Sequence, residues 1–154
     1  TMVCNDLVMP LLLRLQWVSR RQDLTGLLLG ILESVASGVL DPLLGGGTRE
    51  LVVAAEQRNW IVHMHAVGDR AVRESLNGFA YARKLSPTPV PHSISHLQLV
   101  NPKEFPRFKE LGVIASMQPV HQTSDRQMAE ARLGPERLAG AYAWASLKRN
   151  GALV

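Results

Sequence analysis

The clearest pattern of apolar and polar positions lies between residues 60 and 85. Residues 60–66 are apolar or aromatic except for two histidines, and residues 70–84 repeat apolar side chains near the helical period, with a Gly-Asp turn between the two segments. Successive side chains of a strand point to opposite faces, so His63 and His65 share one face. The pattern predicts a strand, a turn and a helix, with two imidazoles on one side of the strand near its end.

Helix and strand patterns alternate along the rest of the chain after residue 47. This order is typical of an α/β fold with a parallel sheet and right-handed crossovers. Two architectures fit it, a partial TIM (β/α)8 barrel and a small doubly wound parallel sheet, and periodicity does not separate them. Pro106 lies inside one helix pattern and predicts that this helix starts late or bends. The other predicted elements are helices at 48–57, 102–111 and 135–149, strands at 93–97 and 113–118, a polar loop at 120–134, and the first residues of another strand at 151–154.

The first part of the chain has the least regular pattern. We expect residues 1–47 to form a separate N-terminal segment and residues 48–154 to form the barrel-type domain. Residues 24–40 have helix-like spacing, although each glycine among them weakens a helix by about 1 kcal/mol relative to alanine. One or two helices are therefore expected in the N-terminal segment, followed by a flexible joint at the glycines 45–47.

Composition excludes several classes of protein. The net charge of +4 is spread along the chain without a basic run interleaved with aromatic residues, so no nucleic-acid partner is expected. The single cysteine, Cys4, excludes an intrachain disulfide and a cysteine-based zinc site, so a bound metal would need histidine and carboxylate ligands. The apolar run at residues 7–18 is too short and interrupted for a membrane span. With no visible secretory signal, a cytoplasmic protein without a membrane partner is expected.

Polar side chains with metal-binding or substrate-binding chemistry fall at the ends of three successive predicted strands. His65 ends the first strand, His96 ends the second, and Gln118 or His121 follows the third. Because neighbouring parallel strands lie about 5 Å apart, the two strand-end imidazoles can approach one metal ion. Catalytic zinc takes three protein ligands and keeps a position open for water, so His65 and His96 would supply part of a metal site. His121 and Asp125 either contact substrate or order the loop around them.

Structural roles compete with chemical roles at several of these positions. His63 alone is interpreted as a hydrogen-bonded structural residue, and His96 could bond to backbone at the end of its strand. His92 follows a proline and is expected in an exposed loop. Asp69 is expected to cap the helix that follows it. No motif supports a serine nucleophile or a phosphate-binding loop.

Four segments of residues 48–154 form a recognisable series. They are His-Ala-Val-Gly-Asp-Arg-Ala at 65–71, Ser-His-Leu-Gln-Leu-Val at 95–100, Ala-Ser-Met-Gln-Pro-Val-His at 115–121 with Ser-Asp at 124–125, and Gly-Ala-Tyr-Ala-Trp at 140–144. In this order they resemble amidohydrolase family 3, whose members are predicted metal-dependent hydrolases of the TIM-barrel amidohydrolase superfamily.

The resemblance implies a role for each matched residue. His65 would be the metal-binding histidine that ends the fifth barrel strand and His96 the one that ends the sixth. Gln118, His121 and Asp125 would lie in the segment after the seventh strand that faces the substrate. It also implies a divalent metal, zinc, and hydrolysis of carbon–nitrogen bonds other than peptide bonds in a small-molecule amide-type substrate, such as an amide or N-formyl compound. The sequence assigns no separate catalytic acid or base.

Parts of the family pattern have no match in the chain. The first-strand His-x-His pair and the fourth-strand bridging ligand are not found, and the eighth-strand aspartate would fall beyond Val154. We therefore expect an incomplete fragment, about the second half of a barrel, that is inactive alone and able to form homo-oligomers through an open sheet edge. The alternative is a degenerate, non-catalytic binding or assembly module.

Overall fold

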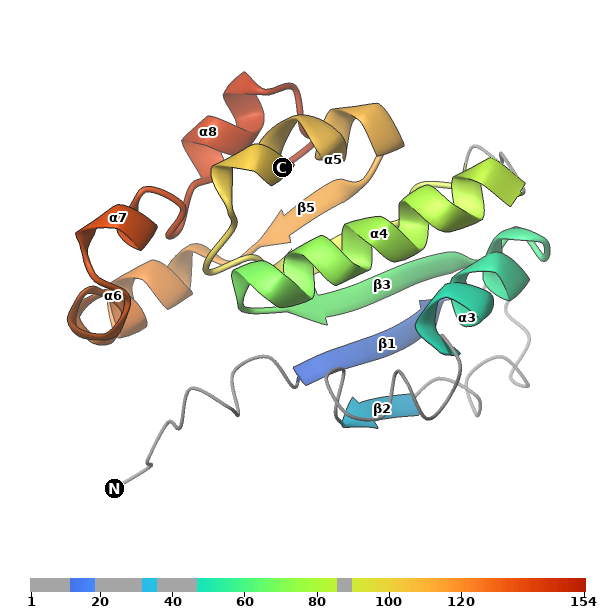
Figure 1. Ribbon diagram of the computed structural model, residues 1–154, viewed down its shortest axis with the longest axis horizontal. Helices are drawn as coiled ribbons and strands as arrows, with labels where there is room; N and C mark the ends of the chain where they lie inside the picture. The colour runs from blue at the N-terminus through green and yellow to red at the C-terminus, as the bar shows by residue number, and fades with distance from the viewer. Residues whose placement is uncertain (1–11, 19–31, 36–46, 86–89) are drawn as a thin grey trace.

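The structure is a computed structural model that describes residues 12–18, 32–35, 47–85 and 90–154 (Figure 1). None of the helices in these ranges is long and apolar enough to span a membrane. The strands are β1 (Leu12–Val18), β2 (Leu32–Val35), β3 (Ile61–Ala66), β4 (Ser93–His96) and β5 (Ile114–Met117). The helices are α3 (Gly47–Glu56), α4 (Asp69–Leu85), α5 (Phe105–Leu111), α6 (Pro119–Leu133), α7 (Pro135–Leu138) and α8 (Trp144–Arg149), with a 3-10 turn η1 (Pro102–Glu104) before α5.

The strands form one sheet in the order β2-β1-β3-β4-β5. β3, β4 and β5 are parallel, and their register places His65 opposite Ser95 and Ser95 opposite Ser116. Helix α4 connects β3 to β4, and η1 with α5 connects β4 to β5 (Figure 1). The predicted alternation of parallel strands with helices is therefore confirmed for these elements. Pro106 lies at the start of α5, which explains why that helix begins after η1.

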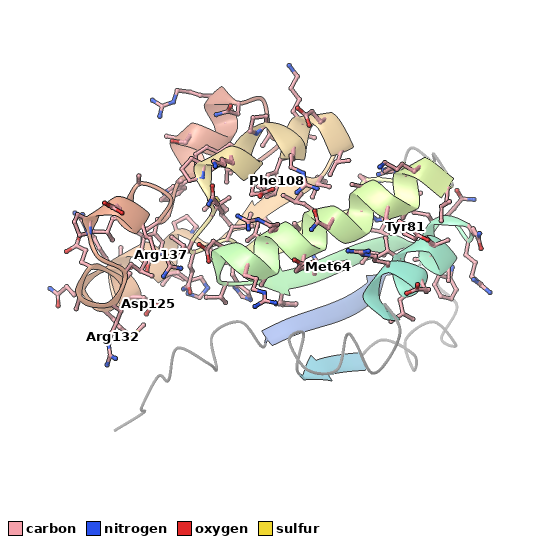
Figure 2. The ribbon with its side chains drawn as sticks, viewed as in Figure 1. Met64, Tyr81, Phe108, Asp125, Arg132 and Arg137 are labelled. Carbon is pink, nitrogen blue, oxygen red and sulfur yellow. The ribbon has the colours of Figure 1, made fainter. Side chains whose placement is uncertain are left out.

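The core lies between the parallel strands and their helices. Met64, Ile94 and Ala115 point from the three strands into a cluster that includes Phe79 of α4 and Phe108 of α5, and all five are fully buried. Met64 and Phe108 are labelled in Figure 2. Burying an aliphatic or aromatic side chain of this size contributes about 1.5–3 kcal/mol, so this cluster fixes the orientation of the sheet under its helices.

The other face of β3 presents the histidines. Ile61, His63 and His65 are half-buried, whereas the residues between them are fully buried against the helices. This alternation confirms the prediction that the two histidines share a face. A parallel sheet whose helices pack on one face matches an arc of a barrel wall, whereas a doubly wound sheet has helices on both faces.

The N-terminal segment differs from the prediction. Residues 12–18 and 32–35 are strands rather than helices: β1 pairs antiparallel with both β2 and β3. β2, which lies within the residues of helix-like spacing, pairs with β1, and β1 pairs with the edge of β3, so backbone pairing between strands outweighs the helix-like spacing at residues 32–35. The rest of the predicted helix at residues 24–40, and glycines 45 and 46 of the expected joint, lie outside the described residues. A domain boundary at residue 47 stays a prediction.

Two further corrections concern residues 119–149. The predicted polar loop at 120–134 is the helix α6, and the predicted single helix at 135–149 is divided into α7 and α8. The break between α7 and α8 follows from a close backbone contact between Gly140 and Val100. Val100 N donates to the carbonyl oxygen of Gly140. A Cβ at Gly140 would lie 2.0 Å from the carbonyl oxygen of Val100. After α8, Ala115 N donates to the carbonyl oxygen of Leu153, so the chain runs beside β5 where another strand was predicted.

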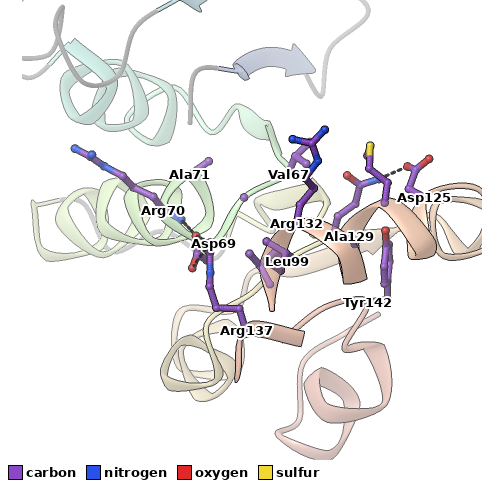
Figure 3. Close-up of a pocket in the computed structure, with 14 residues that line it drawn as sticks. Val67, Asp69, Arg70, Ala71, Leu99, Asp125, Ala129, Arg132, Arg137 and Tyr142 are labelled. Carbon is purple, nitrogen blue, oxygen red and sulfur yellow. Dashed lines mark hydrogen bonds and ion pairs between the residues drawn. The ribbon is translucent and has the colours of Figure 1, made fainter. Parts of the chain in front are cut away.

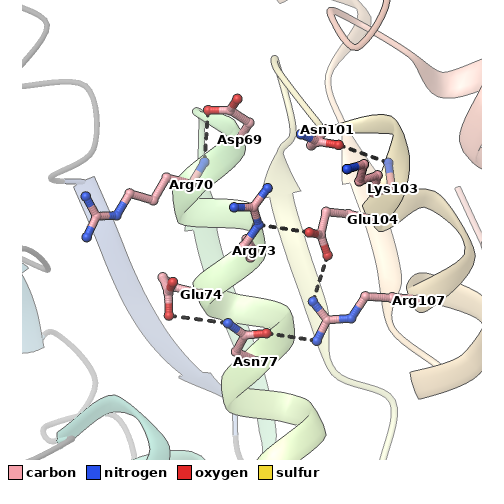
Figure 4. A network of polar contacts seen from close by, with 9 residues as sticks. All are labelled: Asp69, Arg70, Arg73, Glu74, Asn77, Asn101, Lys103, Glu104 and Arg107. Atoms are coloured by element: carbon pink, nitrogen blue, oxygen red, sulfur yellow. Dashed lines mark hydrogen bonds and ion pairs between the residues drawn. The ribbon is translucent and has the colours of Figure 1, made fainter.

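A charged network joins α4 to η1 and α5 (Figure 4). Glu104 is buried, and its carboxylate accepts hydrogen bonds from Arg73 Nε at 2.9 Å and Arg107 Nη1 at 2.7 Å. Arg107 also donates to Asn77 of α4 at 3.0 Å. Burial acts to raise the pKa of Glu104, but the hydrogen bonds and charges of Arg107 and Arg73 lower it below its ordinary value. The network therefore fixes one crossover helix against the next.

His92 is buried at the amino end of the sheet and not in an exposed loop as predicted. Its ring stacks on Phe79 with centroids 4.8 Å apart, Nδ1 accepts from Val62 N at 3.1 Å, and Nε2 lies 3.0 Å from Glu56 Oε1. Since Nδ1 is an acceptor, the proton is on Nε2 and is donated to Glu56. Burial and the charge of Arg83 lower the pKa of His92 to about 4. His92 is thus a neutral residue that connects α3, β3 and β4.

Candidate metal centre

His65 stands at the carboxyl end of β3, where barrel enzymes place reactive groups. Its ring lies 5.2 Å from that of His63, edge to face. His63 Nδ1 is 2.6 Å from Ser93 Oγ on the neighbouring strand, which agrees with the structural, hydrogen-bonded role expected for His63. Asp69, the first residue of α4, accepts from Arg70 N at 3.0 Å, and its role as a helix cap stays a prediction.

His96 reaches the same site through an unusual backbone conformation. The register pairs it with Ala66, whose side chain points into the core, so a regular strand would direct His96 to the helix side. Instead His96 and Leu97 have φ values of 73° and 51°, which turn the His96 ring toward β3. Positive φ costs an ordinary residue about 1–2 kcal/mol, and such strain is concentrated at functional sites.

The outcome is a close pair of imidazoles. His65 Nδ1 lies 2.8 Å from His96 Nε2, and the ring centroids are 4.9 Å apart. A hydrogen bond between these two nitrogens requires that one of them carries a proton and the other does not. A metal ion that replaced this proton would have both lone pairs directed at it.

Gln118 fixes the tautomer of His96. Gln118 Oε1 lies 3.0 Å from His96 Nδ1, and Gln118 Nε2 donates to the carbonyl oxygen of Ser116 at 3.1 Å. Because the amide oxygen can only accept, His96 carries its proton on Nδ1 and leaves the Nε2 lone pair toward His65. Such an outer hydrogen bond is usual for metal-binding histidines. Both ring nitrogens of His96 therefore face side chains instead of the backbone of its own strand.

His121 and Asp125 lie on α6 next to this pair. The His121 ring is 5.3 Å from the ring of His96, and His121 Nδ1 is 3.6 Å from Asp125 Oδ2. Gln98, two residues after His96, donates to the same Asp125 oxygen at 2.9 Å. Sequence reasoning missed Gln98 because its partner is 27 residues away on a segment predicted as loop. The available signal was its position directly after a strand that ends in a candidate ligand.

The electrostatics of the site favour neutral rings at His63 and His96. Burial, together with the charge of His96, lowers the pKa of His63. Burial followed by the charge of His65 lowers the pKa of His96, and the hydrogen bond to Gln118 opposes this only in part. Neutral imidazole is the form that binds metal.

The facing nitrogens of His65 and His96 could supply part of the ligand set of a metal ion. Two zinc-bound nitrogens at about 2.0–2.1 Å in tetrahedral geometry are about 3.3 Å apart, close to the 2.8 Å between the facing nitrogens of His65 and His96. Within residues 49–85 and 90–154, no group of three or more His, Cys, Asp or Glu side chains is arranged to hold a metal. The pair supplies two ligands, one short of the three that a catalytic zinc site takes from protein.

The match of a family model decides the assignment. A model described as the amidohydrolase family matches residues 30–154. The chain belongs to the amidohydrolase family. A comparison with curated proteins finds no match.

Two crystal structures are similar to this amidohydrolase-family chain, both of uncharacterized metal-dependent hydrolases, one from Pyrococcus furiosus and one from Pyrococcus horikoshii OT3. Each is 31% identical, with a TM-score of 0.54 over 66% of this chain. The chain spans 21% and 20% of their respective lengths, so it corresponds to about a fifth of each structure. Its parallel strands alternating with helices agree with part of a TIM barrel of the amidohydrolase fold.

Proposed function

We propose that this chain contributes to a hydrolase acting on carbon–nitrogen bonds other than peptide bonds, with His65 and His96 as two ligands of a divalent metal, zinc. The observation that supports this most directly is the 2.8 Å approach of two imidazole nitrogens at the carboxyl ends of adjacent parallel strands. Family membership and the metal-dependent hydrolases of similar structure support the same proposal. The substrate would be a small molecule with an amide or N-formyl group.

The residues of the proposed site would have separate roles. His65 and His96 would hold the metal, and Gln118 would keep the Nε2 lone pair of His96 directed toward the space between the two rings. A bound divalent metal lowers the pKa of its water toward about 7 and polarises the carbonyl group it faces. His121 and Asp125 would contact the substrate, and Gln98 donates a hydrogen bond to Asp125 at 2.9 Å.

Two ligands are too few for catalysis, so the proposal includes a larger site. Further donors would come from outside the described residues, and the described part of the chain would then be inactive alone. Coverage of about a fifth of the similar structures supports this, because their remaining length has room for the other ligands. A cytoplasmic location and homo-oligomer formation stay predictions.

Zinc binding tests the proposal. We would titrate the full chain with zinc in competition with a chromophoric chelator, and repeat the titration with His65→Ala, His96→Ala, the double variant and His63→Ala. His65→Ala and His96→Ala should each bind zinc at least tenfold more weakly, and the double variant should show no zinc binding at this site. His63→Ala should bind zinc like the unaltered chain. Unchanged zinc binding in the double variant, with circular dichroism showing an intact fold, would refute the proposal, and a lack of zinc affinity in the folded, unaltered chain would favour the non-catalytic module.

A further inference from the structure

A cavity of about 260 Å³ lies between the loops that follow β3 and β4 and the helices α6 and α7 (Figure 3). None of the proposed metal ligands lines it. Its wall is largely apolar, formed by Val67, Ala71, Leu99, Met128, Ala129 and Leu133. This volume is many times the roughly 10–15 Å³ that a single water needs, so the cavity has room for a small organic molecule. The cavity therefore has the mainly apolar, partly enclosed character of a small-molecule site.

One end of the cavity is polar and connected to the histidines. Asp125 accepts from Gln98 at 2.9 Å and lies 3.6 Å from His121 Nδ1, so its carboxylate already has partners. Tyr142 lines the same region, and burial together with the charge of Asp125 raises the pKa of its hydroxyl. The Tyr142 hydroxyl therefore stays protonated and can donate a hydrogen bond to a ligand.

The three arginines that line the cavity differ in their ion pairs and in where their side chains extend. Arg137 Nη2 lies 3.2 Å from both carboxylate oxygens of Asp69, so these two charges neutralise each other. The side chain of Arg70 extends away from the rest of the lining (Figure 3). Arg132 also lines the cavity and forms no ion pair with the described part of the chain. Arg132 is an exposed residue whose guanidinium has no carboxylate partner within residues 49–85 and 90–154, and it lies beside the apolar wall of the cavity.

We propose that this cavity binds a small, largely apolar carboxylate, whose anionic group pairs with Arg132 while its hydrocarbon part packs on Leu99 and Met128. Guanidinium and carboxylate form charge-assisted, often bidentate hydrogen bonds, which an alcohol or an amine cannot reproduce. The inference is independent of the metal. Amide hydrolysis releases a carboxylate, so a site of this chemistry suits the proposed reaction without depending on it.

The test uses the full chain labelled with carbon-13 at its methionine methyl groups. Met128 lines the cavity, whereas Met64 is fully buried in the core, so the two resonances separate local binding from a change of fold. We would titrate hexanoate, 1-hexanol and hexylammonium, which share a hydrocarbon chain and differ in charge. The proposal predicts a saturable shift of Met128 with hexanoate, at least tenfold weaker binding of the other two probes, and a Met64 signal that does not move.

Two arginine variants on α6 complete the test. Arg132→Gln should weaken hexanoate binding about tenfold, whereas Arg126→Gln removes the same charge from an exposed residue that pairs with Glu130 outside the cavity and should have no effect. Equal binding of hexanoate and 1-hexanol, or equal binding by Arg132→Gln and the unaltered chain, would overturn the proposal. In the His65→Ala/His96→Ala variant hexanoate binding should persist, so loss of zinc binding and loss of carboxylate binding are distinguishable.

Discussion

Gln118 Oε1 lies 3.0 Å from Nδ1 of His96, although Gln118 belongs to the connection between β5 and α6 and His96 ends β4. The orientation of a candidate metal ligand therefore depends on where the next strand ends. Gln118 is the residue before α6, so the start of that helix positions the amide.

Replacing Gln118 with alanine should lower zinc affinity about 10-fold to 100-fold, because His96 loses the partner that fixes its tautomer. Gln118→Glu should restore binding, since a carboxylate also accepts from Nδ1–H. Gln122→Ala, within α6, is the control and should bind zinc like the unaltered chain. Nitrogen-15 shifts of His96 report the tautomer directly, and a variant with unchanged shifts and unchanged affinity would refute this positioning role.

Because of His92, the free energy of unfolding should decrease as the pH is lowered. Its pKa is about 4 in the folded chain against an ordinary value of 6.5, so between these values the unfolded chain binds a proton that the folded chain does not. The stabilisation is complete above pH 6.5 and decreases by on the order of 1 kcal/mol per pH unit as the pH falls toward 4. Urea unfolding at several pH values measures the slope. His92→Gln, which keeps an acceptor for Val62 and a donor for Glu56, should show a shallower slope, and parallel slopes would contradict the assignment.

The Glu104 network predicts a different pH window. Glu104→Gln should destabilise the chain by about 2 kcal/mol, because Arg73 and Arg107 then face a neutral amide at a buried position. The lowered pKa of Glu104 means that its stabilisation is present above the unfolded pKa of about 4.3 and is lost as the pH falls through the lower folded value. Glu130→Gln breaks an exposed pair and should cost under about 0.5 kcal/mol. Equal losses for the two variants in urea unfolding would rule out this role.

Gly140 should tolerate no side chain. A Cβ there would lie 2.0 Å from the carbonyl oxygen of Val100, a backbone atom that cannot move without breaking the contact between the loop after β4 and the turn before α8. We expect Gly140→Ala to cost about 2 kcal/mol or more. Gly112→Ala meets no atom within 4 Å and should cost only about 1 kcal/mol for its φ of 63°. Thermal unfolding of both variants separates a backbone clash from simple backbone strain.

Local patterns predicted the parts of the fold in which each element obeys a simple period. The alternation in residues 60–66 correctly placed His63 and His65 on one face, and the order of strands and helices correctly predicted parallel strands. The parallel arrangement correctly predicted that the strand ends carrying His65 and His96 lie side by side. The backbone turn at His96 that brings its ring to His65 has no signature in the sequence, because positive φ is uncommon at any single non-glycine residue, histidine included.

The failures share a physical cause in long-range contacts. His92 is buried because Phe79 and Glu56, both distant in sequence, complete its surroundings, whereas its neighbours alone resemble a loop. Residues 120–134 lack an apolar stripe because α6 has no buried residue, so hydrophobic periodicity had nothing to detect. Strand β1 pairs with β3, and β2 pairs with β1, and the spacing within residues 12–35 does not reveal these partners.

The most direct test of the central proposal is to identify which nitrogens bind the metal. We would record long-range proton–nitrogen-15 spectra of the histidine rings before and after one equivalent of zinc. The proposal predicts that Nδ1 of His65 and Nε2 of His96 move to metal-bound shifts while His92 keeps its signals. If zinc leaves those two nitrogens unchanged and moves other histidines instead, the pair is not a metal site.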